Sequence, residues 1–295
     1  MYVSAIRTDS VAQIDPVLSR MRHLVEQSAP LNSAVLRAVH HHLAAPGQGV
    51  RGKMALQAAL CMGMDAQTAI PLAACCDLLH NASLIHDDLS DGDTERRGIP
   101  TVWSVYGRDV ALCAGDLLIS CAYLALSDLP QSTLIGALLR RVHAHVARTI
   151  HGQAADLLPA AAGCDPIAAY LATAGAKSGP LLCLPLDLAF TLCGDHTARD
   201  LSRDAIMACA IAYQMADDLD DVASDERTEQ GAAANIVIVL QRSLGCNRAT
   251  ALQRATVMAR NHLTQACRLA AALPNGTDAI VRELARRIDL KLNGN

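Results

Sequence analysis

The chain has 295 residues, of which 52% are hydrophobic, and its formal net charge is −4. This charge balance argues against a nucleic-acid partner, and the hydrophobic fraction is large enough to build a sizeable core. With one Trp, one Phe and five Tyr, the core must consist mainly of Ala, Leu, Ile and Val. Ala and Leu are strong helix formers, and the alternating β-branched runs typical of strands are missing. We therefore expect a single all-α domain over residues 1–295.

The eleven cysteines form no C-x-x-C pair, and most of them lie in apolar helical runs. This pattern is typical of small buried side chains in a reducing compartment, and it indicates neither a disulfide framework nor a zinc site. The N-terminus shows no basic segment followed by an apolar one, so we expect no signal peptide. The longest apolar run, residues 178–194, contains two prolines and Asp187 and is interpreted as a core helix, not a membrane span. These features predict a cytoplasmic protein.

Two amphipathic helices are predicted first, at residues 11–26 and 32–43. A flexible, glycine-containing loop is predicted next, at residues 46–53, and it leads into a short helix at residues 54–62. Arg51 and Lys53 lie at this helix start, where backbone amides and basic side chains together suit a phosphate group. A solvated basic loop is the alternative interpretation.

The next predicted helix, residues 66–90, ends in an acidic cluster. Asp87 and Asp91 stand four residues apart and share one face of the last turn, with Asp88 beside them. The C-terminal end of a helix repels carboxylates, so a cation should offset this cluster. His80 lies two turns before Asp87 on the same face, either as a donor to a ligand or as a core histidine with a partner in the protein.

A loop at residues 92–100 follows the first acidic cluster. In it, Arg96 and Arg97 bring two guanidinium groups beside the carboxylates. The planar fork of arginine suits phosphate oxygens, to which it can donate two parallel hydrogen bonds. Helices are then predicted at residues 109–126 and 131–158.

The predicted helix at residues 170–194 carries Lys177 and Ser178 just before two prolines, Pro180 and Pro185. Proline lacks the amide hydrogen of the helical ladder, so both prolines should kink the helix and leave carbonyl groups without partners near Lys177. Such carbonyl dipoles in a dry cavity would stabilise a carbocation.

A second acidic cluster ends the predicted helix at residues 196–222. Asp217 and Asp221 again share a face, with Asp218 between them and Gln214 one turn before Asp218. Two such clusters facing each other would bind hard divalent cations and leave positions open for a phosphorylated ligand. An acidic helix end wetted by solvent is the alternative for either cluster alone, but the matched pair favours the metal. Two amphipathic helices are predicted beyond this point, and we assign them no chemistry.

The order of these motifs resembles that of the trans-isoprenyl diphosphate synthases, also called polyprenyl synthetases, over about residues 47–240. The Asp-Asp-x-x-Asp motif occurs at 87–91 and again at 217–221. The resemblance also covers Arg-Arg-Gly at 96–98, Gly-Gln-x-x-Asp at 152–156, and Lys-Ser at 177–178, where the family has Lys-Thr.

The resemblance implies a helical bundle around a central cavity, and a homodimer that condenses isopentenyl diphosphate head to tail with an allylic prenyl diphosphate. It implies three Mg²⁺, held by the six aspartates Asp87, Asp88, Asp91, Asp217, Asp218 and Asp221. The residues implied to bind the isopentenyl diphosphate are Arg51, Lys53, His80 and Arg97. Those implied at the allylic diphosphate are Arg96, Gln153 and Lys177. The catalytic set implied is Asp87, Asp91, Lys177, Ser178, Gln214 and Asp217.

The sequence departs from the family pattern in two places. Val50 stands where the family has a lysine, and no lysine lies between Arg227 and Asn235, where family members usually carry two. The first departure favours an alternative, a class I terpene cyclase on the same scaffold, and the second favours a catalytically silent partner subunit. The other basic residues and all six carboxylates are retained, and they favour the synthase.

Chain length is the last property that the resemblance addresses. Ala82 and Ser83 stand where short-chain members of the family carry aromatic residues that block the cavity. The small side chains predict a product longer than farnesyl, and geranylgeranyl diphosphate is the expected product.

Overall fold

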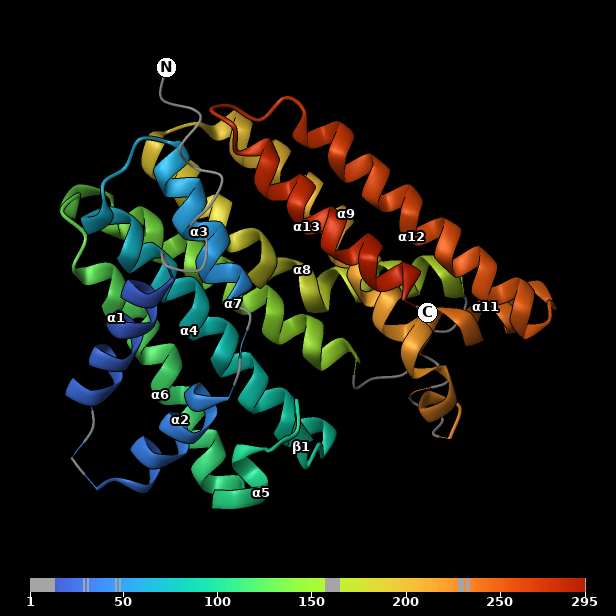
Figure 1. Ribbon diagram of the computed structural model, residues 1–295, viewed down its shortest axis with the longest axis horizontal. Coiled ribbons are helices and arrows are strands. Elements are labelled where there is room, and N and C mark those ends of the chain that lie inside the picture. Colours follow the sequence, from blue (N-terminus) through green and yellow to red (C-terminus); the bar gives the residue numbers. More distant parts are fainter. Residues whose placement is uncertain are drawn as a thin grey trace. The chain divides into compact units, whose positions relative to one another are not determined.

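The computed structural model describes residues 14–28, 30, 32–45, 47, 49–156, 165–227, 231 and 234–294. Within these ranges the regular structure is helical except for one short hairpin, which confirms the all-α prediction (Figure 1). The chain divides into two compact units, Met1–Arg140 and Arg141–Asn295. A single domain stays a prediction. Parts of some predictions lie outside the described residues, namely 11–13, 46, 48, 157–158, 228–230 and 232–233.

The first unit is built around α4, which packs against α1, α3 and α6. This helix is apolar around most of its circumference, and side chains such as Leu72, Cys75 and Leu78 are fully buried. Its start is capped by Asp65, which accepts a hydrogen bond from the amide of Thr68 (3.0 Å). The helices of this unit are α1 (Asp15–Gln27), α2 (Ala34–Ala44), α3 (Val50–Cys61), α4 (Ala66–Asp91), α5 (Val102–Tyr106) and α6 (Arg108–Ser127), with a 3₁₀ turn at Ser132–Leu134. The strands are β1 (Glu95–Arg96) and β2 (Ile99–Pro100).

One local prediction is wrong: α3 begins at Val50, so Arg51 and Lys53 lie in its first turn and not in a loop. The reason is a buried carboxylate from another helix. Asp77 of α4 accepts a hydrogen bond from the amide of Gly52 (3.1 Å) and so satisfies one of the donors that a helix start leaves open. A cap supplied from 25 residues away is invisible to local sequence patterns.

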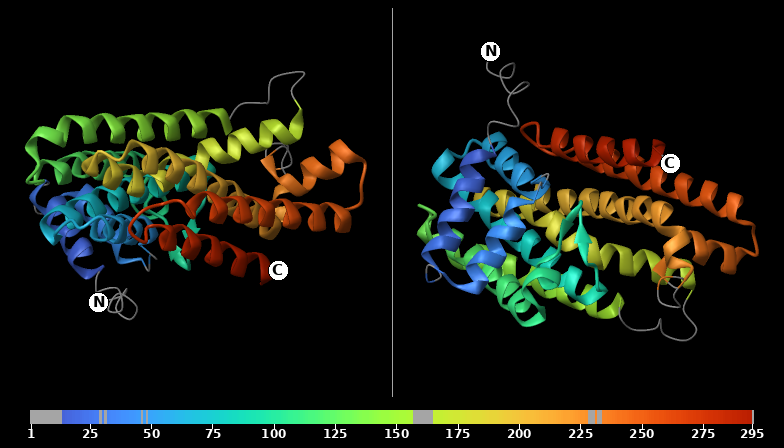
Figure 2. Two further views of the ribbon diagram at one scale, coloured as in Figure 1. Left: turned by 90° about the horizontal axis from the view of Figure 1, so that it is seen from above. Right: turned by 60° about the horizontal axis from the view of Figure 1, so that its bottom comes forward.

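The second unit is built around α9, which packs against α8, α12 and α13. Figure 2 shows α12 and α13, orange to red, lying antiparallel and side by side. The helices are α7 (Ile135–Asp156, which begins in the first unit), α8 (Pro166–Cys193), α9 (His196–Asp225), α11 (Ile236–Leu244), α12 (Arg248–Ala270) and α13 (Asp278–Asn293). Helices α5 and α11 were not predicted from the sequence.

Helix α8 continues through both of its prolines. Pro180 cannot donate to the carbonyl of Ala176, four residues earlier, so this carbonyl loses its helical partner as expected. Gly152 of α7 lies against it: a Cβ at position 152 would stand 2.4 Å from the Ala176 oxygen. Only glycine permits this approach of α7 to the carbonyl that precedes Lys177.

A buried charge cluster joins α7 to α8. The Asp187 side chain is 2% exposed and accepts hydrogen bonds from Nε of Arg141 (2.9 Å) and Nε2 of His145 (2.5 Å). Burial raises the pKa of Asp187, but the bonds from His145 and Arg141 outweigh it and hold the pKa at about 2. The carboxylate is therefore ionised and fully paired at neutral pH.

By length and composition alone, three described helices could cross a membrane: α4, α6 and α8. In the folded chain, 72% of the most apolar window of α4 and half of that of α8 are buried by protein. The absence of a membrane span stays a prediction. The described cysteines are free thiols, and the reducing compartment stays a prediction.

Candidate active site

The first acidic cluster has one buried and two accessible carboxylates. Asp88 is 1% exposed and accepts hydrogen bonds from Nε and a terminal nitrogen of Arg96, both at 2.6 Å. Asp87 is half-buried and Asp91 is exposed. Burial raises the pKa of Asp88, and the bond from Arg96 opposes that shift. Arg96 is therefore the cation that the helix end was expected to need.

The hairpin after α4 brings Arg96 and Arg97 back over the cluster. Glu95 pairs with Pro100 and Arg96 with Ile99, so Arg97 and Gly98 form a two-residue turn. Both turn residues have positive φ, 55° and 78°. This is the backbone of a tight hairpin turn, and glycine at its second position removes the steric cost. The glycine of the Arg-Arg-Gly sequence is thus explained by the backbone conformation of this turn.

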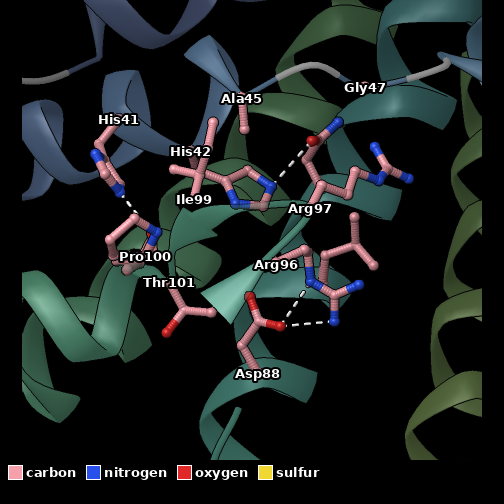
Figure 3. A pocket seen from close by; sticks show the side chains of 13 residues that line it. His41, His42, Ala45, Gly47, Asp88, Arg96, Arg97, Ile99, Pro100 and Thr101 are labelled. Atoms are coloured by element: carbon pink, nitrogen blue, oxygen red, sulfur yellow. Dashed lines mark hydrogen bonds and ion pairs between the residues drawn. The ribbon is translucent and has the colours of Figure 1, made fainter. Parts of the chain in front are cut away.

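A pocket opens beside the hairpin, between α2 and the end of α4 (Figure 3). In it, Nε2 of His42 donates to Oδ1 of Asn81 (3.0 Å), and Nε2 of His41 donates to the carbonyl of Pro100 (2.8 Å). Figure 3 shows Arg96 and Arg97 on the same side of this pocket, with Asp88 below them. Burial lowers the pKa of His42 to about 4, so the imidazole is neutral at physiological pH.

His80 lies close to Arg51 and Arg97. Burial, and then the charges of these two arginines, lower the pKa of His80 well below its usual value, so it is a neutral side chain. Its Nδ1 is buried and has no hydrogen-bond partner among the described residues. This observation favours a ligand donor over a core histidine whose ring is satisfied by the protein. The structure thereby brings together three of the four residues expected to bind isopentenyl diphosphate, and Lys53 follows in the same helical turn as Arg51.

Sequence reasoning missed Asp77, which holds the first turn of α3. Its side chain is 2% exposed, and burial raises the pKa of the carboxyl group while the Gly52 amide, Arg51 and Lys53 oppose that shift. Asp77 thus supports the turn that carries both basic residues. An isolated carboxylate inside the apolar run of α4 was the signal that could have revealed it.

The second acidic cluster, like the first, has one buried aspartate and two more accessible ones. Asp218 is 5% exposed and accepts hydrogen bonds from Nε2 of Gln214 (3.0 Å) and from the amide of Ile236 (2.9 Å) at the start of α11. Burial raises the pKa of Asp218 to about 6. Asp217 is half-buried and ion-paired with Lys291, whereas Asp221 is exposed.

A hydrogen-bonded chain connects α8 to this second cluster. The Ser178 hydroxyl donates to Oε1 of Gln214 (3.3 Å), and Gln214 donates on to Asp218. Gln153 has a buried Nε2 without a hydrogen-bond partner in the described part of the chain. An unsatisfied buried amide is costly, so Gln153 is a ready donor to a ligand. Lys177 precedes Ser178 on α8.

The donors present suit Mg²⁺, even though the described residues form no preformed cage. Among the described residues no group of three or more His, Cys, Asp or Glu side chains converges on one point. Mg²⁺ is usually bound through one or two carboxylates together with waters and substrate phosphates. The oxygen ligands offered by Asp87, Asp91 and Asp221 on accessible helix faces fit that mode of binding.

The family follows from the sequence comparison. Residues 32–236 match the family model "Polyprenyl synthetase", and the chain belongs to this family. It is 36% identical over 177 residues to a (2E,6E)-farnesyl diphosphate synthase of Mycobacterium tuberculosis, a match covering 59% of this chain and 48% of the relative. It is 29% identical over 266 residues to the geranylgeranyl diphosphate synthase of that organism, covering 79% and 76%. The match to the farnesyl diphosphate synthases thus spans about half of their length.

Solved structures show the same fold. The geranylgeranyl pyrophosphate synthetase of Geoglobus acetivorans superposes with a TM-score of 0.80 at 21% identity, covering 92% of this chain and 96% of that one. A decaprenyl diphosphate synthase of Rhodobacter capsulatus gives 0.78 at 17% identity, covering 96% and 98%. The helical fold of isoprenoid synthases is therefore confirmed for this chain.

Proposed function

We propose that the protein catalyses the Mg²⁺-dependent, head-to-tail condensation of isopentenyl diphosphate with an allylic prenyl diphosphate. The observation that carries this proposal is that the two acidic clusters have the same arrangement of buried and accessible carboxylates. In each, the middle aspartate is buried and hydrogen-bonded, which leaves the outer aspartates on a helix face beside a basic side chain. The farnesyl and geranylgeranyl diphosphate synthases among the relatives support this reaction type.

The carboxylates that we assign to metal binding are Asp87, Asp91, Asp217 and Asp221. We assign to Asp88 and Asp218 the task of fixing Arg96 and Gln214 beside them. Three bound Mg²⁺ would supply Lewis-acid charge that stabilises the departing diphosphate of the allylic substrate. Arg96, Gln153 and Lys177 bind that substrate in this proposal.

Isopentenyl diphosphate is bound by a separate set of residues in this proposal. Arg51, Lys53 and Arg97 supply positive charge, and neutral His80 donates one hydrogen bond from a site that burial keeps dry. Ser178 presents its hydroxyl oxygen to the carbocation, and water is excluded because it would quench this species. The released diphosphate can accept the proton, so no protein base is required.

We also propose a cytoplasmic homodimer that forms geranylgeranyl diphosphate. The free cysteines of the described chain support a reducing compartment. The small side chains at Ala82 and Ser83, together with a geranylgeranyl diphosphate synthase among the relatives, support the longer product.

The decisive assay supplies purified protein with Mg²⁺, labelled isopentenyl diphosphate and each of the C5, C10, C15 and C20 allylic diphosphates in turn. We expect label in a prenyl diphosphate longer than the allylic substrate. Release of an unlabelled hydrocarbon from the allylic substrate alone would instead indicate a terpene cyclase. No turnover with any substrate would indicate a silent partner subunit.

Val50→Lys should lower the KM for isopentenyl diphosphate by about tenfold or more, because it adds one charge-assisted contact at the first turn of α3. The KM for the allylic substrate should barely change, because different side chains bind that diphosphate. Steady-state kinetics with each substrate varied in turn measures both constants.

Arg51→Ala is the opposing control and should raise the KM for isopentenyl diphosphate further. If neither variant changes this constant, the start of α3 is not the second diphosphate site. The cyclase would then be the better interpretation.

Ser83→Tyr should shorten the main product to C15 or less, because an added ring blocks the path of the growing chain. Ser83 is half-buried, and its hydroxyl donates to the carbonyl of His80 (2.9 Å). Ala82 is 1% exposed inside the first unit, so Ala82→Phe tests packing as well as product length. Chromatography of the dephosphorylated products decides, and an unchanged distribution with Ser83→Tyr contradicts the prediction.

A further inference from the structure

The sequence contains three lysines, Lys53, Lys177 and Lys291. The first two stand at positions where the proposed function places a diphosphate. Lys291 lies close to the C-terminus, on α13, beyond the residues that match the family model. None of the motifs described above gives it a role.

Lys291 nevertheless contacts the second acidic cluster. Its Nζ forms ion pairs with Oδ1 of Asp217 and with Oδ2 of Asp220 (3.0 Å). The same Nζ lies 5.7 Å from the centre of the Tyr213 ring, one turn before Asp217 on α9. The ammonium group and both carboxylates are only about one third exposed (34%, 28% and 37%), so these charges are partly shielded from water.

The end of α13 is held in place from the other side. Arg260 of α12 donates to Asn293 (2.6 Å) and to Asp289 (3.3 Å), which flank Lys291 in sequence. Helix α13 also packs along both α9 and α12. The position of Lys291 is therefore fixed by contacts on two neighbouring helices as well as by its own ion pairs.

This arrangement puts a monovalent cation on the carboxylate that the proposed function assigns to a divalent one. Asp217, Asp220 and Asp221 lie within five residues on one helix, and without a cation their charges would repel one another. A divalent ion that binds Asp217 must share this carboxylate with the ammonium group of Lys291, which already contacts Oδ1, and the two cations repel each other.

We propose that Lys291 is a tethered cation that occupies the second acidic cluster and competes with divalent metal for Asp217. The inference rests on the metal-binding role of Asp217 in the proposed function. Lys291 offsets part of the negative charge of the cluster before metal binds. It thereby raises the metal concentration at which the cluster becomes occupied.

The test is a titration of the full chain with Mn²⁺, without substrate, in which free Mn²⁺ is followed by electron paramagnetic resonance. Lys291→Gln should tighten one Mn²⁺ site by about tenfold, because it removes one charge-assisted competitor. Lys291→Arg keeps the competing charge and should stay close to the original affinity. Arg286→Gln is the matched control, because Arg286 lies on the same helix but pairs with Glu283.

Asp217→Asn in the Lys291→Gln background should abolish the tightened site. Unchanged or weaker Mn²⁺ binding in Lys291→Gln overturns the proposal. A second measurement uses the unaltered protein, so it does not depend on a variant that folds correctly. Acylation of Lys291, measured by mass spectrometry, should increase when Mn²⁺ is added. Acylation of Lys53 is the internal reference. Equal labelling of Lys291 with and without Mn²⁺ also contradicts the proposal.

These measurements need no turnover, so the two proposals can fail separately. Tightened Mn²⁺ binding in a protein that forms no prenyl diphosphate would overturn the proposed function and leave the inference standing. An active synthase whose Mn²⁺ affinity is the same with Lys or Gln at position 291 would overturn the inference and leave the proposed function standing.

Discussion

Asp87→Asn should lower kcat for condensation by a factor on the order of several hundred or more. The substitution keeps the size of the side chain and removes the charge of a metal ligand, and the metals are proposed to stabilise several kcal/mol of leaving-group charge. Asp87 is half-buried at the end of α4, so an isosteric amide should leave the fold intact. Asp217→Asn should act in the same way from the second cluster. Single-turnover kinetics with labelled isopentenyl diphosphate measures the loss.

Asp93→Asn is the matched control for charge. It removes an exposed carboxylate from the same end of α4, just beyond the motif, and should change kcat only slightly. Full activity of the unaltered protein in excess chelator would contradict the metal mechanism, whatever the variants do.

Asp187→Asn should destabilise the chain by about 3–5 kcal/mol, because it removes one partner from a buried ion pair and leaves the others uncompensated. Arg141 is 27% exposed and can partly recover its hydration, which places the expected value toward the lower end. Urea denaturation followed by circular dichroism measures the change. Asp187 lies outside the proposed catalytic residues, so the effect should appear in stability before it appears in chemistry.

Glu283→Gln is the control for this prediction. The hydrogen bond from Arg286, and a second from Arg287, hold the pKa of Glu283 at about 2, as low as that of Asp187. Glu283 lies on the surface of α13, where solvent screens its ion pairs, so its loss should have a much smaller effect. Equal destabilisation by the two substitutions would contradict a special role for burial at Asp187.

The pH dependence follows from the direction of the shift. The folded-state pKa of Asp187, about 2, lies below its ordinary value of 3.8, so the unfolded chain binds the proton more readily. The stabilisation is complete above about pH 4 and is lost as the pH falls toward 2. Asp187→Asn should therefore flatten the acid limb of the stability curve.

The sequence by itself determined where most helices lie and which residues carry chemistry. Helical periodicity, the capping residue Asp65 and the arginine hairpin are local features, and local interactions decide them. The two acidic clusters were recognisable because each carries its carboxylates within a single turn. The expectation that a cation must offset a helix end rich in aspartate was also physical, and Arg96 fulfils it at the first cluster.

Two helices escaped prediction for opposite reasons. Helix α5 is only five residues long, too short for a periodic pattern to emerge. Helix α11 carries a clear signal, because Asn235 accepts a hydrogen bond from the amide of Val237 and caps an apolar run. No element was predicted at these residues, although the cap and the apolar run are both local signals.

Only the tertiary structure decided how charges are partnered across the sequence. Asp77 caps a helix 25 residues away, and Asp218 accepts a hydrogen bond from the start of α11, 18 residues away. Lys291 reaches Asp217 across 74 residues. A sequence pattern shows which charged or polar groups require a partner, because that requirement depends on the residue and its neighbours along the helix. The identity of the partner depends on how the helices pack, and packing brings together residues that are far apart in the sequence.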